Sequence, residues 1–199
     1  IQDIANNLLN QYQQKDESTA PLNDCRQSVL ASAVILQLIA EKKLQYQDRS
    51  IEFNYDNNND NYAFIRIDPS AFKRMLSNII NNSIEACDQK NCEITVRLKT
   101  DNEWIRLIVE DNGKGMSQDL INKIMNHVAV TEGKQEGHGL GLTQVCEALE
   151  RNQGELAIES KLGKGTKVTL SFPRLSAPAW IADKIEFNRD DIVIILDDD

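Results

Sequence analysis

Long apolar runs and a recognisable leader are both missing from this sequence. Its longest apolar stretch, Leu30–Ala40, is interrupted by Ser32 and Gln37, whereas a membrane-spanning helix needs about 18 or more apolar residues in succession. The chain opens on Ile1 rather than Met, with a segment rich in Gln and Asn that does not resemble a signal peptide. We therefore expect a fragment of a longer protein, with this part located in the cytoplasm.

Metal-binding and basic residues are also scarce. The 199 residues include two histidines and four cysteines, and no two cysteines form a CxxC pair, so a zinc site is not expected. The cysteines are instead expected to be reduced thiols. Acidic residues outnumber basic ones by 31 to 22, a net charge of −9, and this balance disfavours nucleic acid or an anionic membrane as a partner.

The spacing of the apolar residues predicts a chain in which helices and pairs of strands follow one another. Helices are predicted over 1–15, in a second segment that ends near Tyr46, from Asp68 through Ile84, over 118–126 and over 140–152. Strands are predicted over 51–55, 63–67, 93–100, 104–110, 155–160 and 166–172. This order favours an α+β fold, a two-layer sandwich in which a mixed sheet carries helices on one face.

Two of these helices allow more detailed predictions. Asp68 is expected to cap the helix that begins at Pro69. The helix ending near Tyr46 is expected to bury four apolar side chains on one face: Leu30, Val34, Leu38 and Leu44. We divide the chain into a helical end at 1–21, a compact domain at 22–174, and a linker with a further strand at 175–199.

Three glycines alternate in Gly137–Gly141, immediately before a predicted helix. Glycine lets backbone N–H groups approach an anion closely, and the N-terminus of a helix adds partial positive charge. The segment therefore suits a polyphosphate. Taken alone it is equally compatible with a flexible loop.

A second glycine-bearing turn, Asp111–Met116, follows a predicted strand. A buried carboxylate at the end of that strand would accept a hydrogen bond from an adenine amino group, and Gly113 and Gly115 would let the chain turn tightly around the base. The alternative is a plain Asp-Asn-Gly turn. A calcium loop is disfavoured because Lys114 stands where an acidic ligand would be needed.

Asn78 and Asn82 are four residues apart, so they share one face of a predicted helix. That face is otherwise apolar, where an amide is costly to bury. The Asn82 oxygen would suit a Mg²⁺ shell completed by water and phosphate oxygens. A packing or capping role is the alternative for either residue alone, and Asn81 is expected to face solvent.

In order and spacing the three segments resemble the N, first-glycine and second-glycine boxes of the GHKL superfamily of ATP-binding domains. That superfamily includes histidine kinases, gyrase-type ATPases, Hsp90-type chaperones and MutL-type repair proteins. Gly163–Thr166 matches a fourth box, and the resemblance covers roughly 50–173. It implies a Bergerat-type ATP-binding fold with ATP and Mg²⁺ as ligands.

The resemblance also implies a role for each matching residue. Asp111 would bind the adenine amino group, Asn82 the Mg²⁺, Thr166 the adenine through a water, and Lys134 a phosphate. The residues expected around ATP are Asn82, Asp111, Gly113, Gly115, Met116, Thr131, Gly137, His138, Gly139, Leu140, Gly141, Leu142 and Thr166. The pattern is incomplete in one place, because Ile124–Val128 contains no phenylalanine where a phenylalanine-rich box is usual.

Asn78 discriminates among the branches of the superfamily. The ATPase branches carry at this position a glutamate that activates water, and an amide is no base at neutral pH. We therefore expect transfer of the γ-phosphoryl group to a histidine on a separate helical hairpin, as in the catalytic domain of a sensor histidine kinase. Asn78 and Lys134 are the expected catalytic residues. A GHKL-type ATPase and an anti-sigma serine/threonine kinase are the alternatives.

Further partners follow from the same resemblance. Ile1–Lys15 is similar to the end of an acceptor hairpin, and Ile192–Asp199 resembles the first strand of a receiver domain, as in a hybrid kinase. His127 and His138 both lie near the second glycine box, so the phosphoacceptor histidine is expected outside this chain. The expected partners are the acceptor hairpin of the same kinase and a response regulator or receiver domain, with a homodimeric parent protein.

Overall fold

The computed structural model describes residues 26–57, 62–87, 91–126 and 141–178. One compact unit spans Arg26–Ser176. Its elements are β1 (Gln27–Leu30), α2 (Ala31–Gln45), β2 (Ile51–Asp56), β3 (Phe64–Ile67), α3 (Pro69–Ala86), β4 (Cys92–Thr100), β5 (Trp104–Asp111), α4 (Gln118–Met125), α5 (Gly141–Arg151), β6 (Glu155–Ser160) and β7 (Thr166–Pro173).

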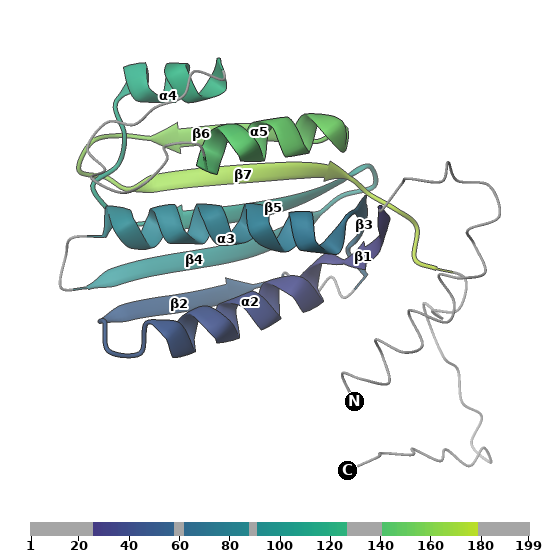
Figure 1. Cartoon of the computed structure of the whole chain (residues 1–199), viewed down its shortest axis with the longest axis horizontal. Coiled ribbons are helices and arrows are strands. Elements are labelled where there is room, and N and C mark those ends of the chain that lie inside the picture. The colour runs from purple at the N-terminus through teal and green to yellow at the C-terminus, as the bar shows by residue number, and fades with distance from the viewer. Residues whose placement is uncertain (1–25, 58–61, 88–90, 127–140, 179–199) are drawn as a thin grey trace, which may run out of the picture. The chain divides into compact units, whose positions relative to one another are not determined.

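Five of the strands form one mixed sheet in the order β2-β4-β5-β7-β6. The pair β2 and β4 is parallel, and the other three pairs are antiparallel. Helices α2, α3 and α5 lie over one face of this sheet (Figure 1). The predicted α+β sandwich, with a mixed sheet and helices on one face, is confirmed.

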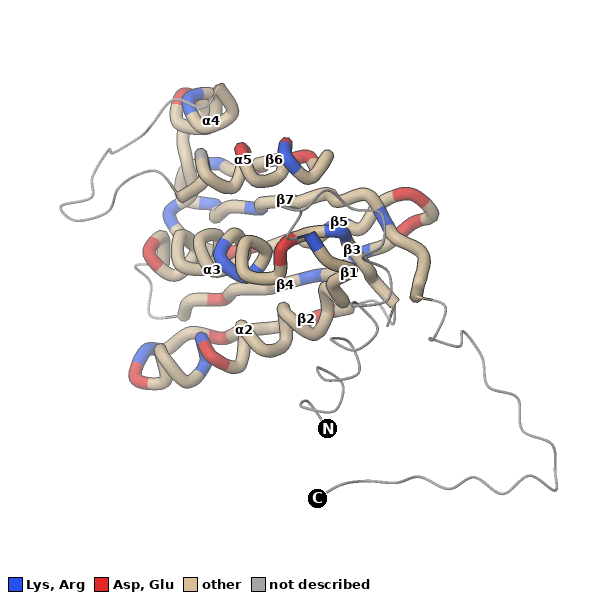
Figure 2. The backbone as a smooth tube through the Cα atoms, turned by 45° about the vertical axis from the view of Figure 1, so that its right-hand side comes forward, with Lys and Arg blue, Asp and Glu red and all other residues tan. Residues whose placement is uncertain are grey.

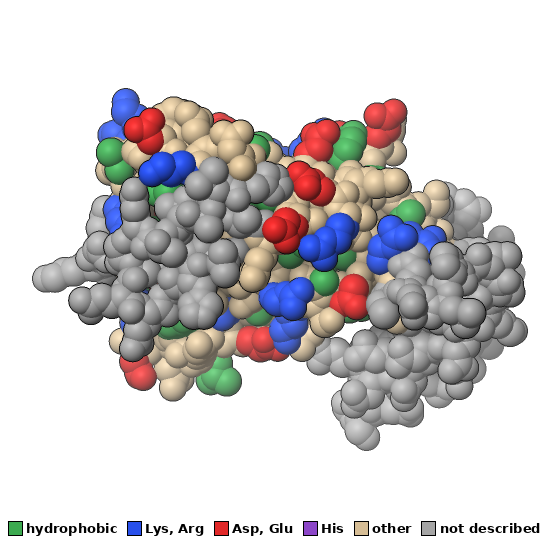
Figure 3. Space-filling model, turned by 45° about the horizontal axis from the view of Figure 1, so that its top comes forward, with side chains coloured by type: hydrophobic (Ala, Val, Ile, Leu, Met, Phe, Trp, Pro, Cys, Tyr) green, Lys and Arg blue, Asp and Glu red, His purple; other side chains and the backbone are tan. Residues whose placement is uncertain are grey.

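The core lies between the sheet and these helices. Along β4, Ile94, Val96 and Leu98 are fully buried under the helices, and the residues between them face the other side of the sheet. That other side is polar, with an ion pair between Lys167 and Glu159 at 2.6 Å. Acidic and basic residues are interspersed along the chain (Figure 2) and lie next to one another on the surface (Figure 3).

Helix α3 crosses the middle of the sheet and begins as predicted. The Asp68 carboxylate accepts a hydrogen bond of 2.8 Å from the Ala71 amide, and Pro69 is the first helical residue. The helix buries one apolar face made of Phe72, Met75, Leu76, Ile79, Ile80 and Ile84.

The prediction for α2 was wrong at both ends. Leu30 belongs to the strand β1, which pairs antiparallel with β3 in a separate two-stranded sheet. Leu44 is 71% exposed, because it lies about 240° around the helix from the buried Leu38. The buried face of α2 is made of Ala31, Ser32, Ile35, Leu38, Ile39 and Lys42, with Val34 packed at its edge.

The prediction of reduced thiols was wrong for two cysteines. Cys87 follows the last residue of α3 and Cys92 begins β4, and the two form a disulfide with their Cα atoms 5.6 Å apart. The helix end and the strand start thus bring them within the usual range for such a bond. Cys146 is free and buried, and Cys25 lies outside the described residues.

Several predictions fall outside the described residues: the helix at 1–15, the strand at 192–196 and the segment 127–140. The domain boundaries at 21 and 174 therefore stay predictions. Within the described part of the chain, no helix combines the length and the apolar composition needed to cross a membrane.

Candidate functional site

Asp111 ends β5, the central strand of the sheet, and its carboxylate is buried. Its Oδ1 atom accepts hydrogen bonds from the backbone amides of Gly113 at 2.9 Å and Thr166 at 3.2 Å. Burial raises the pKa of this carboxyl group, although hydrogen bonds from Gly113, Ser83 and Thr166 partly offset the rise. The buried carboxylate is therefore held by hydrogen bonds from the turn that follows it and from the first residue of β7.

The pairing of β5 with β7 explains why Thr166 reaches Asp111. These two residues are direct partners in the antiparallel register. The structure thus brings together two residues that lie 55 positions apart in the sequence and that the sequence assigned to one adenine site. Thr166 is also buried.

Gly113 and Gly115 are needed because other backbone segments press against them. A Cβ atom on Gly113 would lie 2.6 Å from the Ala86 carbonyl oxygen at the end of α3. On Gly115, which has φ +68°, a Cβ atom would lie 2.1 Å from the carbonyl oxygen of Lys161 in the β6–β7 turn. The turn Asp111–Met116 is thus clamped between a helix end and a neighbouring hairpin.

Sequence reasoning assigned no role to two further residues, which contact this turn from β6 and from the β6–β7 turn. A Cβ atom on Gly165 would lie 1.9 Å from the Asp111 carbonyl oxygen. The Ser160 hydroxyl accepts a hydrogen bond of 2.8 Å from the Met116 amide and donates to the Gly165 carbonyl at 2.8 Å. The signal for Gly165 was present in the fourth box, whereas Ser160 has no sequence signal because it comes from β6.

Ser83 is the third residue that was missed. It is buried on α3, directly after Asn82, and it hydrogen-bonds the Asp111 carboxylate. This contact ties the helix that carries the two asparagines to the strand end that carries the carboxylate. A hydroxyl on an otherwise apolar helix face was the signal that would have revealed it.

Asn78 and Asn82 lie on α3 and are both half-buried. A Cβ atom on Gly141, the first residue of α5, would lie 3.9 Å from the Asn78 side chain. The end of the second glycine box and the first asparagine of the N box are therefore neighbours in space.

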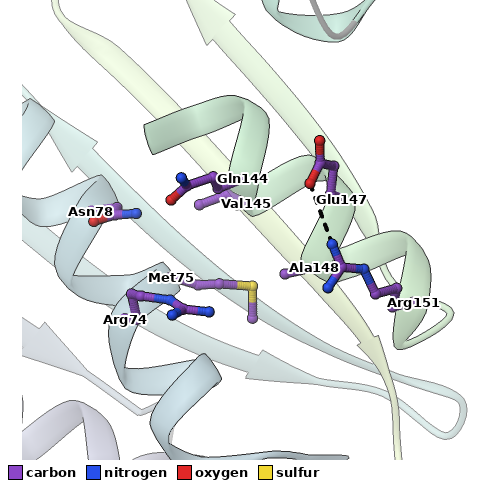
Figure 4. A pocket seen from close by; sticks show the side chains of 8 residues that line it. All are labelled: Arg74, Met75, Asn78, Gln144, Val145, Glu147, Ala148 and Arg151. Atoms are coloured by element: carbon purple, nitrogen blue, oxygen red, sulfur yellow. Dashed lines mark hydrogen bonds and ion pairs between the residues drawn. The ribbon is translucent and has the colours of Figure 1, made fainter. Parts of the chain in front are cut away.

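Asn78 also lines a groove of about 250 Å³ between α3 and α5. The groove continues along the two helices past Arg74 and ends at Arg151, which pairs with Glu147 at 3.3 Å (Figure 4). Its remaining lining residues are Met75, Gln144, Val145 and Ala148. The lining is mostly polar and leads away from the asparagine.

Asn81 does not face solvent as expected. Its side-chain oxygen accepts a hydrogen bond of 2.7 Å from the Nζ of Lys42, a buried residue of α2. Burial lowers the pKa of that lysine. Asn81 therefore joins two helices, a function that α3 alone does not reveal.

The remaining predicted ligand-binding residues divide into two groups. Leu142 is half-buried and packs against the hydrophobic core, and Met116 contributes its backbone amide to the bond with Ser160. Those in the segment 127–140 lie outside the described residues: Thr131, Lys134, Gly137, His138, Gly139 and Leu140.

Two relatives of similar sequence are the sensor protein EvgS and the sensor histidine kinase ZraS, both of Escherichia coli K12. EvgS is 31% identical over 131 residues, 63% of this chain and 11% of its own length. ZraS is 31% identical over 138 residues, 69% of this chain and 28% of its own length. The chain thus spans only a small part of these relatives.

Among solved structures, the catalytic domain of the histidine kinase ThkA has the same fold, with a TM-score of 0.65 at 20% identity, covering 75% of this chain and 95% of that one. The family model described as histidine kinase-, DNA gyrase B- and HSP90-like ATPase matches residues 67–176, more than half of the sequence. That stretch contains Asn78, Asn82, Asp111 and Thr166, and the chain belongs to this family of ATPases.

Proposed function

We propose that this chain binds Mg·ATP and transfers the γ-phosphoryl group to a histidine on a separate helical hairpin, as the catalytic domain of a sensor histidine kinase. The observation that carries the proposal is the buried Asp111 carboxylate, held by the amides of Gly113 and Thr166. It is supported by family membership and by the names of the similar proteins EvgS and ZraS.

At the adenine end, Asp111 would supply the specificity for adenine, because it would bind the amino group of the base. Both backbone amides donate to Oδ1, so Oδ2 is the oxygen that would accept from the adenine amino group. A hydrogen bond to an ionised, buried acceptor is about twice as strong as a neutral one. Gly113 and Gly115 let the turn pack directly against Ala86 and Lys161, and this packing would hold the Asp111 carboxylate in position for the base.

At the phosphate end, the residues of α3 and α5 fit a metal-bound triphosphate. The N-terminus of α5 begins at Gly141 beside Asn78, and a helix N-terminus favours anions. No three His, Cys, Asp or Glu side chains gather as a metal site within the described residues. Mg²⁺ would take the Asn82 oxygen with phosphate and water oxygens, and when bound it would neutralise phosphate charge.

Asn78 favours transfer over hydrolysis. It lies beside the start of α5, where a glutamate would be placed to activate water. Its amide does not accept a proton at neutral pH. An imidazole acceptor is its own nucleophile, so phosphoryl transfer to histidine requires mainly positioning and charge stabilisation from this chain.

The partners follow from this reaction. The γ-phosphoryl group requires the acceptor hairpin of the same kinase, and the phosphohistidine requires the receiver domain of a response regulator. We propose that the parent protein is a homodimer.

The test is to incubate the chain with [γ-³²P]ATP and Mg²⁺, alone and together with the acceptor hairpin of the parent kinase. Protein-bound label and released phosphate are both measured. We expect acid-labile label on the hairpin, negligible label on the chain itself and slow phosphate release.

Two other outcomes would move the protein to another branch of the family. Fast phosphate release by the chain alone would indicate an ATPase. Acid-stable label on a serine of a partner protein would indicate a serine/threonine kinase. A chain that does not bind Mg·ATP in calorimetry would contradict the proposal as a whole.

A further inference from the structure

The disulfide between Cys87 and Cys92 closes the short connection from α3 to β4. Cys87 is the C-cap residue of α3, and Cys92 pairs with Ile51 at the start of the parallel ladder between β4 and β2. Both cysteines are buried, each with 3% of its surface exposed. The bond therefore fixes a helix end relative to a strand start inside the domain.

Asn112, in the turn that follows Asp111, holds the residues on both sides of Cys92. Its Oδ1 accepts a hydrogen bond of 2.9 Å from the Glu93 amide, and its Nδ2 donates to the Asn91 carbonyl at 2.9 Å. The Sγ atom of Cys87 lies 3.8 Å from the same Oδ1. One amide side chain thus contacts the disulfide and both of its flanking peptide groups.

The other end of the disulfide reaches the same turn through Ala86. The Ala86 carbonyl accepts a hydrogen bond of 2.9 Å from the Lys114 amide. Gly113 is packed so closely against Ala86 that a Cβ atom would lie 2.6 Å from that carbonyl oxygen. The residue before Cys87 therefore supports one side of the turn, and the residues flanking Cys92 support the other.

We propose that Cys87 and Cys92 form a reversible thiol–disulfide site that sets the affinity of the adenine pocket. The inference rests on the proposed function, because its effect is exerted on the nucleotide. In the disulfide form, the helix end and the strand start are held together, and the Asn112–Lys114 segment is preorganised between them. Reduction frees the two peptide segments to move separately, and the Cys87 thiol becomes a donor that competes for Asn112 Oδ1.

The chemistry is ordinary thiol–disulfide exchange with a dithiol. A thiolate of the dithiol attacks one sulfur of the Cys87–Cys92 bond, forming a mixed disulfide and releasing the other cysteine as a thiolate. The second thiol of the dithiol resolves the mixed disulfide. The chain gains two electrons and two protons, and the dithiol becomes a disulfide. Because both cysteines are buried, exchange requires a local opening that exposes their sulfur atoms.

The experiment compares the full chain before and after treatment with dithiothreitol. Alkylation with iodoacetamide followed by mass spectrometry reports the state of Cys87 and Cys92. Hydrogen exchange at the Glu93 and Lys114 amides reports the coupling to the turn without any nucleotide. Calorimetry with Mg²⁺ and the ATP analogue AMP-PNP reports affinity. The double variant Cys87→Ser/Cys92→Ser and the control Cys146→Ser, which removes a buried free thiol, are treated in the same way.

We expect Cys87 and Cys92 to resist alkylation until they are reduced. Reduction should speed exchange at both amides and lower AMP-PNP affinity roughly two- to twelve-fold, the cost of ordering about one more side chain on binding. The double serine variant should behave like the reduced chain with or without dithiothreitol, and Cys146→Ser should respond like the unmodified chain.

Three results would overturn the inference: alkylation of Cys87 and Cys92 before reduction, equal amide exchange at Glu93 and Lys114 in both states, or an AMP-PNP affinity that reduction does not change. A chain that binds no AMP-PNP in either state but changes its amide exchange on reduction would contradict the proposed function. In that case the coupling of the disulfide to the turn would stand.

Discussion

A Cβ atom on Gly165 would lie 1.9 Å from the carbonyl oxygen of Asp111. No side chain fits in that gap, and the φ of Gly165, +86°, is also one that L-residues rarely adopt. We predict that Gly165→Ala destabilises the domain by about 2–5 kcal/mol, because it adds overpacking to the backbone penalty. It should also weaken nucleotide binding by displacing Asp111. Chemical denaturation and calorimetry measure the two effects.

Gly163 offers a matched control in the same turn. Its φ is +73°, and nothing lies within 4 Å of the position of its Cβ atom. Gly163→Ala should therefore lower the free energy of unfolding by about 1–2 kcal/mol, the penalty for a side chain at positive φ. It should leave nucleotide affinity unchanged. Equal destabilisation by the two variants would show that the close approach to Asp111 is unimportant.

Asp111→Asn should lower ATP affinity without lowering the stability of the domain. The amide oxygen of asparagine still accepts from Gly113 and Thr166, but its NH₂ group replaces the oxygen that we assign to adenine. Loss of a charge-assisted hydrogen bond, about 1.5–3 kcal/mol, lowers ATP affinity roughly 10- to 150-fold. The free energy of unfolding at neutral pH should not fall, because the variant removes a buried charge. Calorimetry tests the predicted loss of ATP affinity, and urea denaturation tests the predicted stability. An unchanged ATP affinity would contradict the assignment of Asp111 to adenine.

The raised pKa of Asp111 predicts a pH dependence with a definite sign. The folded state holds this proton to higher pH than the unfolded state does. The contribution of Asp111 to the free energy of unfolding therefore decreases as pH rises from its ordinary value of 3.8 through the raised pKa. ATP affinity should show the opposite trend and fall as pH drops through the raised pKa, because protonation removes the acceptor.

Asp111→Asn supplies the baseline for this measurement. Protonation of ATP itself affects both proteins equally, so the difference between their affinities isolates the carboxyl group. Calorimetric titrations across the acidic range should show the two affinities converging as pH falls. A constant ratio of affinities would mean that Asp111 does not contact the base in its ionised form.

The local structure around Asp111, where we propose that adenine binds, could be predicted largely from local sequence. Asp111 follows an alternating strand, and Gly113, Gly115 and Thr166 lie within short motifs whose spacing reflects tight turns. The cap at Asp68 was also predictable, because a side chain that caps a helix bonds a backbone amide only three residues away. In each case the information lies within a few neighbouring residues.

Two of the mispredicted features depend on partners distant in the chain. The strand β1 forms because Gln27–Leu30 pairs with Phe64–Ile67, and that pairing overrides the local preference for helix. Asn81 bonds Lys42, 39 residues earlier. The disulfide is a different case, because Cys87 and Cys92 are only five positions apart in the sequence. It depends on the convergence of a helix end and a strand start, and the two cysteines form no recognised spacing motif.

The contact between Lys42 and Asn81 gives a stability prediction of its own. Asn81→Leu removes the 2.7 Å acceptor of a buried ammonium group, which keeps a longer bond of 3.2 Å to Gln45, and we expect a loss of about 1–3 kcal/mol in the free energy of unfolding. Removing both partners in Lys42→Met/Asn81→Leu should recover most of it. Gln37→Ala, which removes an exposed bond to Glu41, should change stability by less than about 0.5 kcal/mol. A double variant as unstable as Asn81→Leu would contradict this account.

Asn78→Glu tests why the chain should transfer phosphate rather than release it. Asn78 is half-buried and lies beside the first residue of α5, where we expect the phosphates to bind. A carboxylate at this position would act as a general base toward water, and such groups contribute about 10²- to 10⁴-fold to reaction rates. We expect phosphate release by the chain alone to rise by about 10²-fold, and the rise to disappear when EDTA removes Mg²⁺. Asn78→Gln is the matched control, since it lengthens the side chain without adding a base, and it should not accelerate release. If Asn78→Glu binds ATP normally and releases phosphate no faster than Asn78→Gln, then Asn78 does not face the γ-phosphate.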